Sequence, residues 1–370
     1  MNLVMGALKF FSLPFILSLL LVPVAKYIGY RVEAYAMENN RTVHQGKIVR
    51  IGGLAIFLAF LISMAVYINA DQTINGILVG GIIIFLCGLL DDMFNLSPLM
   101  KVIFQSIGAL CAIVIGNITL TTISLPFLKI DLQALSYLVS FIWILGVTNA
   151  INLIDGLDGL SSGISLIVVC VIGLLGFFMG RRDVVLISLM LAGAIAGFLP
   201  YNFHPASIFV GDSGALFLGF MIACLSLLGF KTSTFITLGF PIIILFVPLS
   251  DTVLAIIRRK LNGQKISDAD KSHVHHVLMF KIGLGHKRSV LVLYAVTIVF
   301  GIGAIVSYFN EFYGVVLLVL FSFIAWIFIE LTGMINPRFH PVIGLLRRTI
   351  KWPRKSKHAF FEANRIHDDA

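Results

Sequence analysis

The stretch NAINLIDGLDGLSSG, residues 149–163, decides the fold, because it places polar and acidic residues between two long apolar runs. Asn152, Asp155 and Asp158 follow one another closely and are interleaved with glycines. A carboxylate at a membrane boundary is costly to keep without a partner, so acids at such positions are functional candidates. Gly156 allows a ligand to approach the backbone, and the next apolar run predicts a helix whose N-terminal amides favour anions. The stretch therefore predicts a polar site at membrane level, although Asp158 alone could be only a helix cap.

The composition of the whole chain is that of a protein that crosses a membrane many times. Of its 370 residues, 59% are hydrophobic and 12% are charged, and the mean hydropathy is +1.00. Soluble domains carry about 25% charged residues, so the composition excludes the soluble globular class. The four cysteines all lie inside apolar runs and predict neither a disulfide framework nor a metal cluster. We therefore expect an all-α polytopic membrane protein.

Eleven apolar runs predict about eleven transmembrane helices, and the first should stay as a helix because it lacks a signal-peptide cleavage pattern. The runs lie near residues 4–24, 51–69, 76–90, 99–116, 134–150, 160–179, 184–199, 213–230, 235–257, 289–308 and 314–334. Alternate connections collect 22 of the 27 Lys and Arg residues, which assigns that side to the cytoplasm. The N-terminus is then outside and the C-terminus inside. Residues 1–334 should form one transmembrane domain, followed by a basic cytoplasmic tail, residues 335–370.

The connection after the fourth run, ITLTTISLPFLKID, predicts a different local structure. It alternates apolar and β-branched residues around a proline. We expect a short extracellular β-hairpin there.

A second acidic group ends the third apolar run. Asp91 and Asp92 are adjacent at a predicted helix C-terminus, where the helix dipole and their mutual repulsion both disfavour negative charge. Such a pair calls for a cation, although solvation at the interface is an alternative. Lys101 follows in the motif LSPLMK.

A third acid lies in PYNFHPASIFVGDSGALFLGF, residues 200–220, which again joins two apolar runs. This segment offers Asn202, the aromatic Phe209 and Asp212. Asp212 alone could be a plain helix cap. Because three connections on one side each bring acids to membrane level, we favour a site for a hard cation such as Mg²⁺, with Mn²⁺ as a substitute.

The longest inner connection is basic and contains clustered histidines. His273, His275 and His276 lie among eight cationic residues between positions 258 and 288. Zinc is an alternative, but no cysteine accompanies the histidines. Charge-assisted hydrogen bonds to a diphosphate suit this composition better.

The first inner connection, residues 25–50, brings His44 and Arg50 close to the second apolar run. Basic residues that flank a span are also expected from topology alone. Together, these connections suit the transfer of a phosphorylated group from a diphosphate donor to an acceptor in the membrane.

Four motifs, in this order and on one predicted face, resemble the polyprenyl-phosphate N-acetylhexosamine-1-phosphate transferases, the glycosyltransferase 4 family. They are DDMFN, NLIDGLDGLSSG, YNFHPASIFVGDSG and DKSHVHHVLM. The resemblance covers nearly the whole chain and is closest to the branch that starts wall teichoic acid synthesis. It implies transfer of N-acetylglucosamine 1-phosphate from UDP-N-acetylglucosamine to undecaprenyl phosphate at the cytoplasmic face of the bacterial plasma membrane. The site would be built from residues 25–50, 91–98, 150–160, 200–212 and 258–288.

The resemblance also implies roles for individual residues. Asp212 would be the main Mg²⁺ ligand, helped by Asp155 and Asp92, and Asp91 the base for the nucleophilic phosphate. Lys101 would bind the acceptor phosphate. The remaining substrate contacts would come from Asn152, Asp155, Gly156, Asp158, Asn202, Phe209, His44, Arg50, His273, His275 and His276, with Phe209 stacking on uracil and the last two on the diphosphate.

Two departures from the family pattern bear on these roles. Asn95 stands where many relatives carry a third acid, and the first connection reads AMENNRTVH, which weakens the support for His44. The motif HVHH differs from the three consecutive histidines of the phospho-MurNAc-pentapeptide transferases and favours the N-acetylglucosamine donor.

Several alternatives stay open at this point. The same chemistry could use another UDP-N-acetylhexosamine or UDP-MurNAc-pentapeptide. A transporter or flippase would also have many spans, but its acids should lie near the midplane. A receptor or scaffold would leave the acidic clusters unexplained. Relatives include dimers, so a homodimer is an open option, and we expect no nucleic-acid partner.

Overall fold

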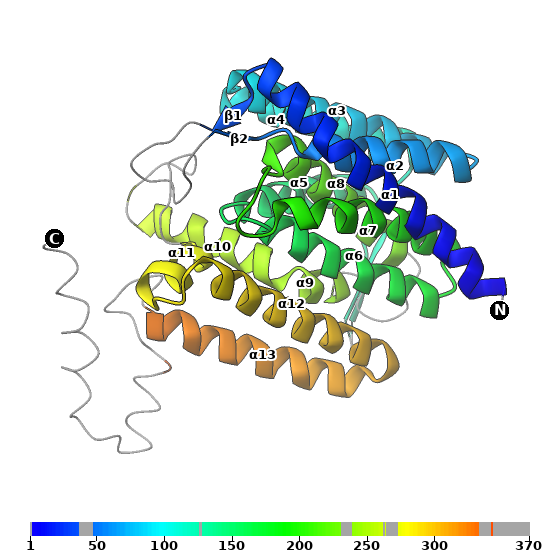
Figure 1. Ribbon diagram of the computed structural model, residues 1–370. Coiled ribbons are helices and arrows are strands. Elements are labelled where there is room, and N and C mark those ends of the chain that lie inside the picture. Colours follow the sequence, from blue (N-terminus) through cyan, green and yellow to red (C-terminus); the bar gives the residue numbers. More distant parts are fainter. Residues whose placement is uncertain are drawn as a thin grey trace, which may run out of the picture.

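We describe the fold from a computed structural model of the chain (Figure 1). The structure describes residues 2–36, 47–125, 128–230, 239–261, 263, 273–332 and 342. His44, a predicted substrate contact, and nearly all of the predicted tail lie outside these residues, so their assignments stay predictions.

Nine helices of the described part are long and apolar enough to cross a membrane. They belong to α1 (Asn2–Arg31), α3 (Gln72–Phe94), α4 (Pro98–Leu110) with the π-helical turn η1 (Cys111–Ile115), α5 (Leu135–Leu153), α6 (Leu160–Phe178), α7 (Arg182–Asn202), α8 (Gly211–Phe230), α12 (His286–Phe309) and α13 (Glu311–Thr332). The all-α polytopic class is thereby confirmed.

The two other predicted spans take different forms. The run 51–69 forms α2 (Gly53–Tyr67), an apolar helix that is shorter than the rest. In the described part of 235–257 the chain forms two helices, α9 (Gly239–Ile244) and α10 (Phe246–Leu261). The number eleven and the orientation therefore remain predictions.

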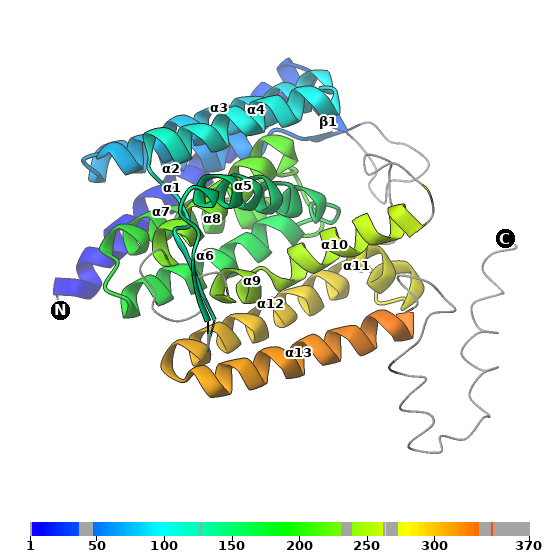
Figure 2. The same ribbon diagram turned by 180° about the vertical axis from the view of Figure 1, so that it is seen from behind.

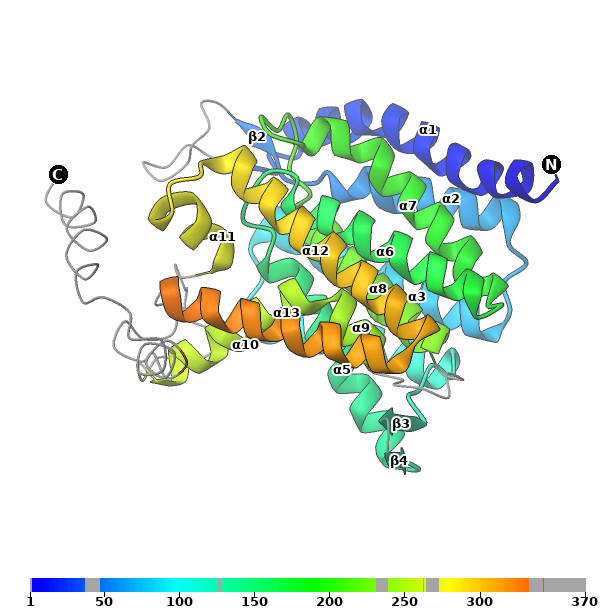
Figure 3. The same ribbon diagram turned by 90° about the horizontal axis from the view of Figure 1, so that it is seen from below.

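Helix α8 lies at the centre of the molecule, where α2, α3, α5, α6 and α7 pack against it (Figures 1 and 3). In its apolar window 94% of the residues are buried inside the protein, compared with 6% for α13 at the periphery. Glycines make the close packing possible, since a Cβ on Gly53 would overlap the backbone of Gly214, and one on Gly88 would overlap the backbone of Asp212. The first turn of α8 is thus held tightly between α2 and α3.

The predicted β-hairpin is confirmed. Strands β3 (Thr122–Leu125) and β4 (Leu128–Asp131) pair antiparallel. A second short pair joins β1 (Tyr35–Ala36) to β2 (Ile48–Val49). In Figure 2 the β3–β4 hairpin lies toward the end of the bundle where α1 begins, and β1 lies at the other end.

The polar motifs meet at the end of the bundle that carries β1 and β2. There the C-terminal ends of α3 and α5 face the N-terminal ends of α4 and α8. His275 of the short helix α11 (Val274–His276), which continues into the π-helical turn η2 (Val277–Lys281), lies against Gly156 in the turn between α5 and α6. The predicted acids therefore gather at one end of the bundle and not at its midplane, which disfavours a transporter site.

Candidate active site

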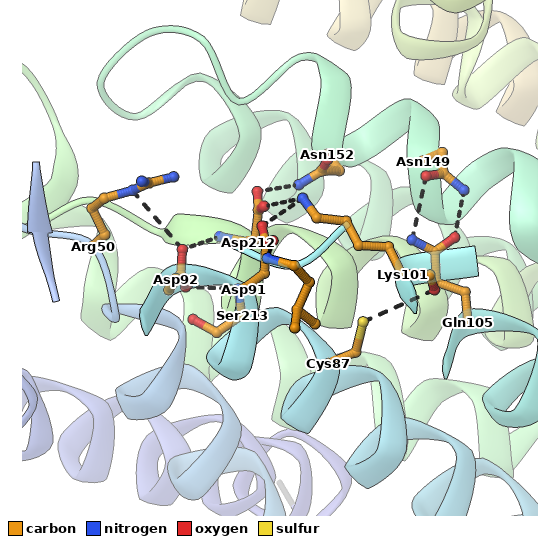
Figure 4. Close-up of polar contacts among 11 residues, drawn as sticks. Arg50, Cys87, Asp91, Asp92, Lys101, Gln105, Asn149, Asn152, Asp212 and Ser213 are labelled. Atoms are coloured by element: carbon orange, nitrogen blue, oxygen red, sulfur yellow. Dashed lines mark hydrogen bonds and ion pairs between the residues drawn. The ribbon is translucent and has the colours of Figure 1, made fainter. Parts of the chain in front are cut away.

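Asp212 is the point at which three helices converge. It lies in the first turn of α8 and is partly buried. Lys101 Nζ, from α4, donates to Asp212 Oδ2 at 2.8 Å, and Asn152 Nδ2, from α5, donates to Oδ1 at 2.7 Å (Figure 4). Because these partners come from other helices, the carboxylate does more than cap its own helix.

Asp91 shares the same cation. Its Oδ2 lies 2.5 Å from Lys101 Nζ, and its Oδ1 accepts a hydrogen bond from the backbone N–H of Leu96 at 2.7 Å. The chain turns sharply here because the C-cap residue Asn95 takes the left-handed conformation, with φ 52°. Lys101, six positions beyond Asn95, is therefore the cation that Asp91 binds.

Asp92 has a different environment, although it is the next residue. Its Oδ1 and Oδ2 accept hydrogen bonds from the backbone N–H groups of Asp212 and Ser213, both at 2.9 Å. Arg50 Nε lies 4.0 Å from Oδ1. Asp92 thus binds the N-terminal amides of α8, where a negative charge is favourable, and fixes Asp212 in place. This geometry fits a positioning residue better than the metal ligand that the resemblance implies.

The groups around Asp212 fit a hard divalent cation. Asp91 and Asp212 direct carboxylate oxygens to one shared positive charge, the ammonium group of Lys101. Asn152 adds an amide next to them. Oxygen donors of this kind suit Mg²⁺, which is bound through one or two carboxylates together with substrate phosphates.

Asp155 lies in the turn between α5 and α6. Its Oδ1 accepts a hydrogen bond from the hydroxyl of Ser161, at 2.5 Å, in the first turn of α6. Burial raises the pKa of Asp155 to about 7, because the surroundings disfavour the charged form. A carboxyl group with such a pKa can hold or release a proton near neutral pH, and a bound cation would favour its ionised form.

Asp158 is not the cap of α6. The N-cap position belongs to Gly159, which has φ 77° and makes no side-chain cap bond. Instead, Asp158 Oδ2 lies 2.8 Å from His204 Nδ1 and accepts from the backbone N–H of Ala206 at 3.1 Å. The backbone N–H of Asp158 donates to His286 Nε2 at 2.9 Å. Asp158 therefore joins three connections of the chain, and the alternative of a simple helix cap is wrong.

Among the residues that the structure describes, Asp158, His204 and His286 are the one group of three His, Cys, Asp or Glu side chains whose candidate ligand atoms all lie within 4.8 Å of one another. The two rings stack, with centroids 4.2 Å apart and an angle of 16° between their planes. Since the lone pair of a ring nitrogen lies in the plane of its ring, two parallel stacked rings do not aim at one ion. We interpret the group as a set of hydrogen bonds that holds the turn between α5 and α6 against His204 and His286.

A cavity of about 290 Å³ opens beside Asp212. It is of the size of a small-molecule site. Asp212 lines it together with most of the predicted substrate contacts, which are Arg50, Asn152, Asp155, Gly156, Asp158, Asn202, Phe209 and His276. His286, which the sequence interpretation missed, lines it too. Asp91, Asp92, Lys101, His273 and His275 lie outside its lining.

Asn202 and Phe209 both line this cavity, but their side chains have different roles. Asn202 is buried, accepts a hydrogen bond from Ser162 Oγ at 2.6 Å and donates to the carbonyl of Ile208 at 3.0 Å. It therefore fixes the turn that precedes Phe209. Phe209 is partly exposed at the cavity, and its backbone pairs with the segment from Val49 to Gly52.

The histidine segment is anchored by an acid that the sequence interpretation did not identify. Asp251 of α10 is 1% exposed, its Oδ2 lies 2.8 Å from His273 Nδ1, and its Oδ1 accepts from the backbone N–H of Val274 at 2.9 Å. The signal was present, since Asp251 is an acid inside the apolar run 235–257. His273 is therefore held by the protein, with its ring stacked beside that of His275 at 5.7 Å.

His275 is placed against the acidic turn. Its side chain occupies the space that a Cβ on Gly156 would need, which explains the glycine. Burial lowers the pKa of His275 to about 3, with a further contribution from the charge of His276. His275 is therefore neutral at physiological pH and can meet a phosphate only as a neutral donor or acceptor.

This lowered pKa predicts a pH-dependent stability. Between pH 6.5 and about 3 the unfolded chain takes up a proton at His275 that the folded chain refuses, so acidification destabilises the fold. The expected loss is about 1.4 kcal/mol for each pH unit below 6.5. In His275→Gln this contribution is absent, so Tm should fall less between pH 7.5 and 5.5 than in the wild type. Equal falls of Tm in the two proteins would contradict the buried, neutral state.

Comparison with known proteins agrees with this geometry. The model of glycosyl transferase family 4 matches residues 74–230, which include Asp91, Asp155 and Asp212. A Bacillus subtilis (strain 168) protein named "probable undecaprenyl-phosphate N-acetylglucosaminyl 1-phosphate transferase" is 42% identical over 350 residues, covering 91% of this chain and 96% of that protein.

Two further relatives come from other bacteria. A Mycobacterium leprae protein named decaprenyl-phosphate N-acetylglucosaminephosphotransferase is 32% identical, over 72% of this chain and 75% of its own length. A Thermotoga maritima undecaprenyl-phosphate alpha-N-acetylglucosaminyl 1-phosphate transferase is 30% identical, over 78% of this chain and 86% of its own length. The identity to the Bacillus protein over nearly both whole chains, together with the matched model, establishes that the chain belongs to glycosyl transferase family 4.

Proposed function

We propose that the chain transfers N-acetylglucosamine 1-phosphate from UDP-N-acetylglucosamine to undecaprenyl phosphate and releases UMP. The observation that carries the proposal is the convergence of Lys101 and Asn152 on Asp212, beside a cavity that Phe209 lines. The names of the relatives, which describe this type of transfer, support it.

The reaction is one displacement at phosphorus. An oxygen of the acceptor phosphate forms a bond to the β-phosphorus of the donor, and the bond from that phosphorus to the bridging oxygen breaks. The sugar stays on the β-phosphate, the bridging oxygen leaves with UMP, and the product is undecaprenyl-diphospho-N-acetylglucosamine. The acceptor is a phosphate monoester with a second pKa near 6, so at neutral pH it needs orientation more than deprotonation.

The residues divide this work by position. Lys101, next to Asp91 and Asp212, would draw the acceptor phosphate to the acidic end of α3. Asp91 would orient that phosphate and accept its proton when it carries one. In the cavity, Phe209 would stack on the uracil ring, and Arg50 and His276 would contact the diphosphate.

Mg²⁺ would be held by Asp212, with Asp155 and Asn152 nearby, and would neutralise the charge that develops on the diphosphate oxygens. Asp92 would act through its bonds to the first amides of α8, which hold Asp212 in place. Mn²⁺ should substitute because it also accepts oxygen ligands.

The lipid acceptor explains the location of the site at one end of a helical bundle. We place this end at the cytoplasmic face of a bacterial plasma membrane, because the Lys and Arg residues gather on that side of the chain. The product would start a cell-wall polymer such as wall teichoic acid.

Release of UMP by the purified protein tests the proposal. With undecaprenyl phosphate and Mg²⁺, UDP-N-acetylglucosamine should give UMP well above a control without lipid. UDP-N-acetylgalactosamine and UDP-MurNAc-pentapeptide should give much less under the same conditions. Lipid-dependent UMP from either of these donors, in preference to UDP-N-acetylglucosamine, would overturn the assigned donor, and absence of UMP from folded protein would overturn the reaction.

Asp251 provides a separate prediction. In Asp251→Asn the amide oxygen can still accept from the backbone N–H of Val274, but the NH₂ group then faces His273 Nδ1, so the imidazole must move its proton to Nε2 or lose this contact. We expect kcat to fall roughly 10-fold to 100-fold while KM for the donor changes little, because the histidine segment shifts relative to the diphosphate. Steady-state kinetics measure both constants. An unchanged kcat would remove Asp251 from the positioning of this segment.

A further inference from the structure

Asn149, the first residue of the acidic stretch, has no role in the proposed chemistry but makes a specific contact. Its Nδ2 donates to Gln105 Oε1 at 2.7 Å, and Gln105 Nε2 donates back to Asn149 Oδ1 at 3.4 Å (Figure 4). Asn149 Nδ2 also donates to the carbonyl of Leu145, one turn earlier in α5. The two amides thus form a reciprocal pair between α4 and α5, and Gln105 is only 1% exposed.

The position of this pair relates it to the site. Gln105 lies four residues after Lys101 on α4, and Asn149 lies three residues before Asn152 on α5. Residues three or four apart share one face of a helix. The same two helix faces therefore carry two polar links. One is the amide pair, and the other is formed by the hydrogen bonds of Lys101 and Asn152 to Asp212.

The chemistry of the pair suits a link that sets the relative position of two helices. Within a membrane, amide side chains on neighbouring helices satisfy each other because no water or lipid group replaces them. Each amide has a donor and an acceptor, so the reciprocal bonds form at one relative position of α4 and α5. A slip of either helix along its axis would break the pair and move Lys101 relative to Asn152.

We propose that Gln105 and Asn149 are positioning residues for the transfer reaction, which set α4 against α5 so that Lys101 and Asn152 reach the two oxygens of Asp212 together. This inference rests on the proposed function. A positioning role differs from a purely stabilising one, because it requires that the length and the polarity of these two side chains affect kcat and not only Tm.

Three variants of the full chain test the proposal by kinetics of UMP release. Gln105→Leu and Asn149→Leu remove the pair while keeping the volume of the side chains close to the original. The exchanged double variant, Gln105→Asn with Asn149→Gln, swaps the two amide side chains between the helices. The combined length of the two side chains therefore stays the same. The matched control is Ser226→Ala, which removes another polar link between helices, from Trp143 Nε1 of α5 to Ser226 Oγ of α8 at 2.9 Å. Ser226 lies about 21 Å along α8 from Asp212, at 1.5 Å per residue.

The expected result is a fall of kcat by about 10-fold to 100-fold in each leucine variant, with KM for UDP-N-acetylglucosamine within about 2-fold of the wild type. The exchanged variant should recover to within about 5-fold of the wild-type kcat. Ser226→Ala should keep its kcat even if its Tm falls as far as that of the leucine variants.

Two results would overturn the proposal: leucine variants whose kcat matches that of Ser226→Ala, or an exchanged variant no more active than the single variants. If a leucine variant does not fold, the kcat of the exchanged variant is compared with that of the wild type and of Asn149→Gln alone. An exchanged variant no more active than Asn149→Gln would then overturn the proposal. Wild-type protein is assayed in parallel. Its own failure to release UMP would contradict the proposed function, whereas active wild type with unaffected variants contradicts only the positioning role.

Discussion

Asp212→Asn should lower kcat by on the order of 10³ or more while the protein stays folded. The change removes the negative charge that Lys101 and the proposed Mg²⁺ share. It also places an NH₂ group where either Lys101 or Asn152 donates, because both carboxylate oxygens are acceptors in the structure. UMP release at saturating donor, lipid and Mg²⁺ measures the effect, and Tm confirms folding.

Asp183→Asn is the matched control for this substitution. Asp183 lies in the first turn of α7, at the other end of that helix from Asn202, and pairs with Arg181 at 2.7 Å. It should retain wild-type turnover. Near-normal activity of Asp212→Asn would remove Asp212 from the metal role.

Lys101→Met has the second large expected effect: it should lower turnover but raise the affinity for Mg²⁺. Without the ammonium group Asp91 and Asp212 lose their shared cation, so Mg²⁺ should bind more tightly. The acceptor phosphate loses its cationic partner at the same time, so kcat/KM for undecaprenyl phosphate should fall by roughly 10²-fold or more. Titrations with Mg²⁺ and with the lipid separate the two effects.

Lys101→Arg is the control for charge. It keeps the cation with a different shape and should restore part of kcat/KM for the lipid, with an Mg²⁺ dependence close to that of the wild type. If Lys101→Met showed a normal acceptor KM and an unchanged Mg²⁺ dependence, Lys101 would have no role at this carboxylate pair.

The sequence predicted well those features that depend on local pattern. Apolar runs and their polar interruptions marked the helices, the β3–β4 hairpin and the stretches that carry Asp91, Asp155 and Asp212. An acid in an apolar run can be recognised from the sequence alone, because the free-energy cost of placing a carboxylate there arises whichever residue pairs with it. The grouping at one end of the bundle followed from the order of the spans.

The partners could not be predicted, because they are set by the packing of distant segments. Asp92 and Asp91 have the same sequence environment, yet one binds the amides of α8 and the other binds Lys101. The contact between Lys101 and Asp212 spans 111 positions of the chain. For the same reason Asp158 was open to interpretation as a helix cap until the structure showed its contact with His204.

The helix break inside one apolar run was also missed. The run 235–257 is apolar throughout most of its length, but the described part forms the separate helices α9 and α10. Its one acid, Asp251, lies in α10 and binds the histidine segment. An apolar run predicts burial or contact with lipid, but it does not predict whether the helix continues.

The phosphate next to the sugar should be transferred together with the sugar, and a doubly labelled donor tests this most directly. UDP-N-acetylglucosamine carrying ³²P at the β-phosphate and ¹⁴C in the sugar is incubated with purified protein, undecaprenyl phosphate and Mg²⁺. Our account predicts that both labels enter the lipid product in a one-to-one ratio and that the nucleotide released is unlabelled UMP. Lipid that carries only ¹⁴C, with ³²P left in UDP, would show plain sugar transfer and contradict the account.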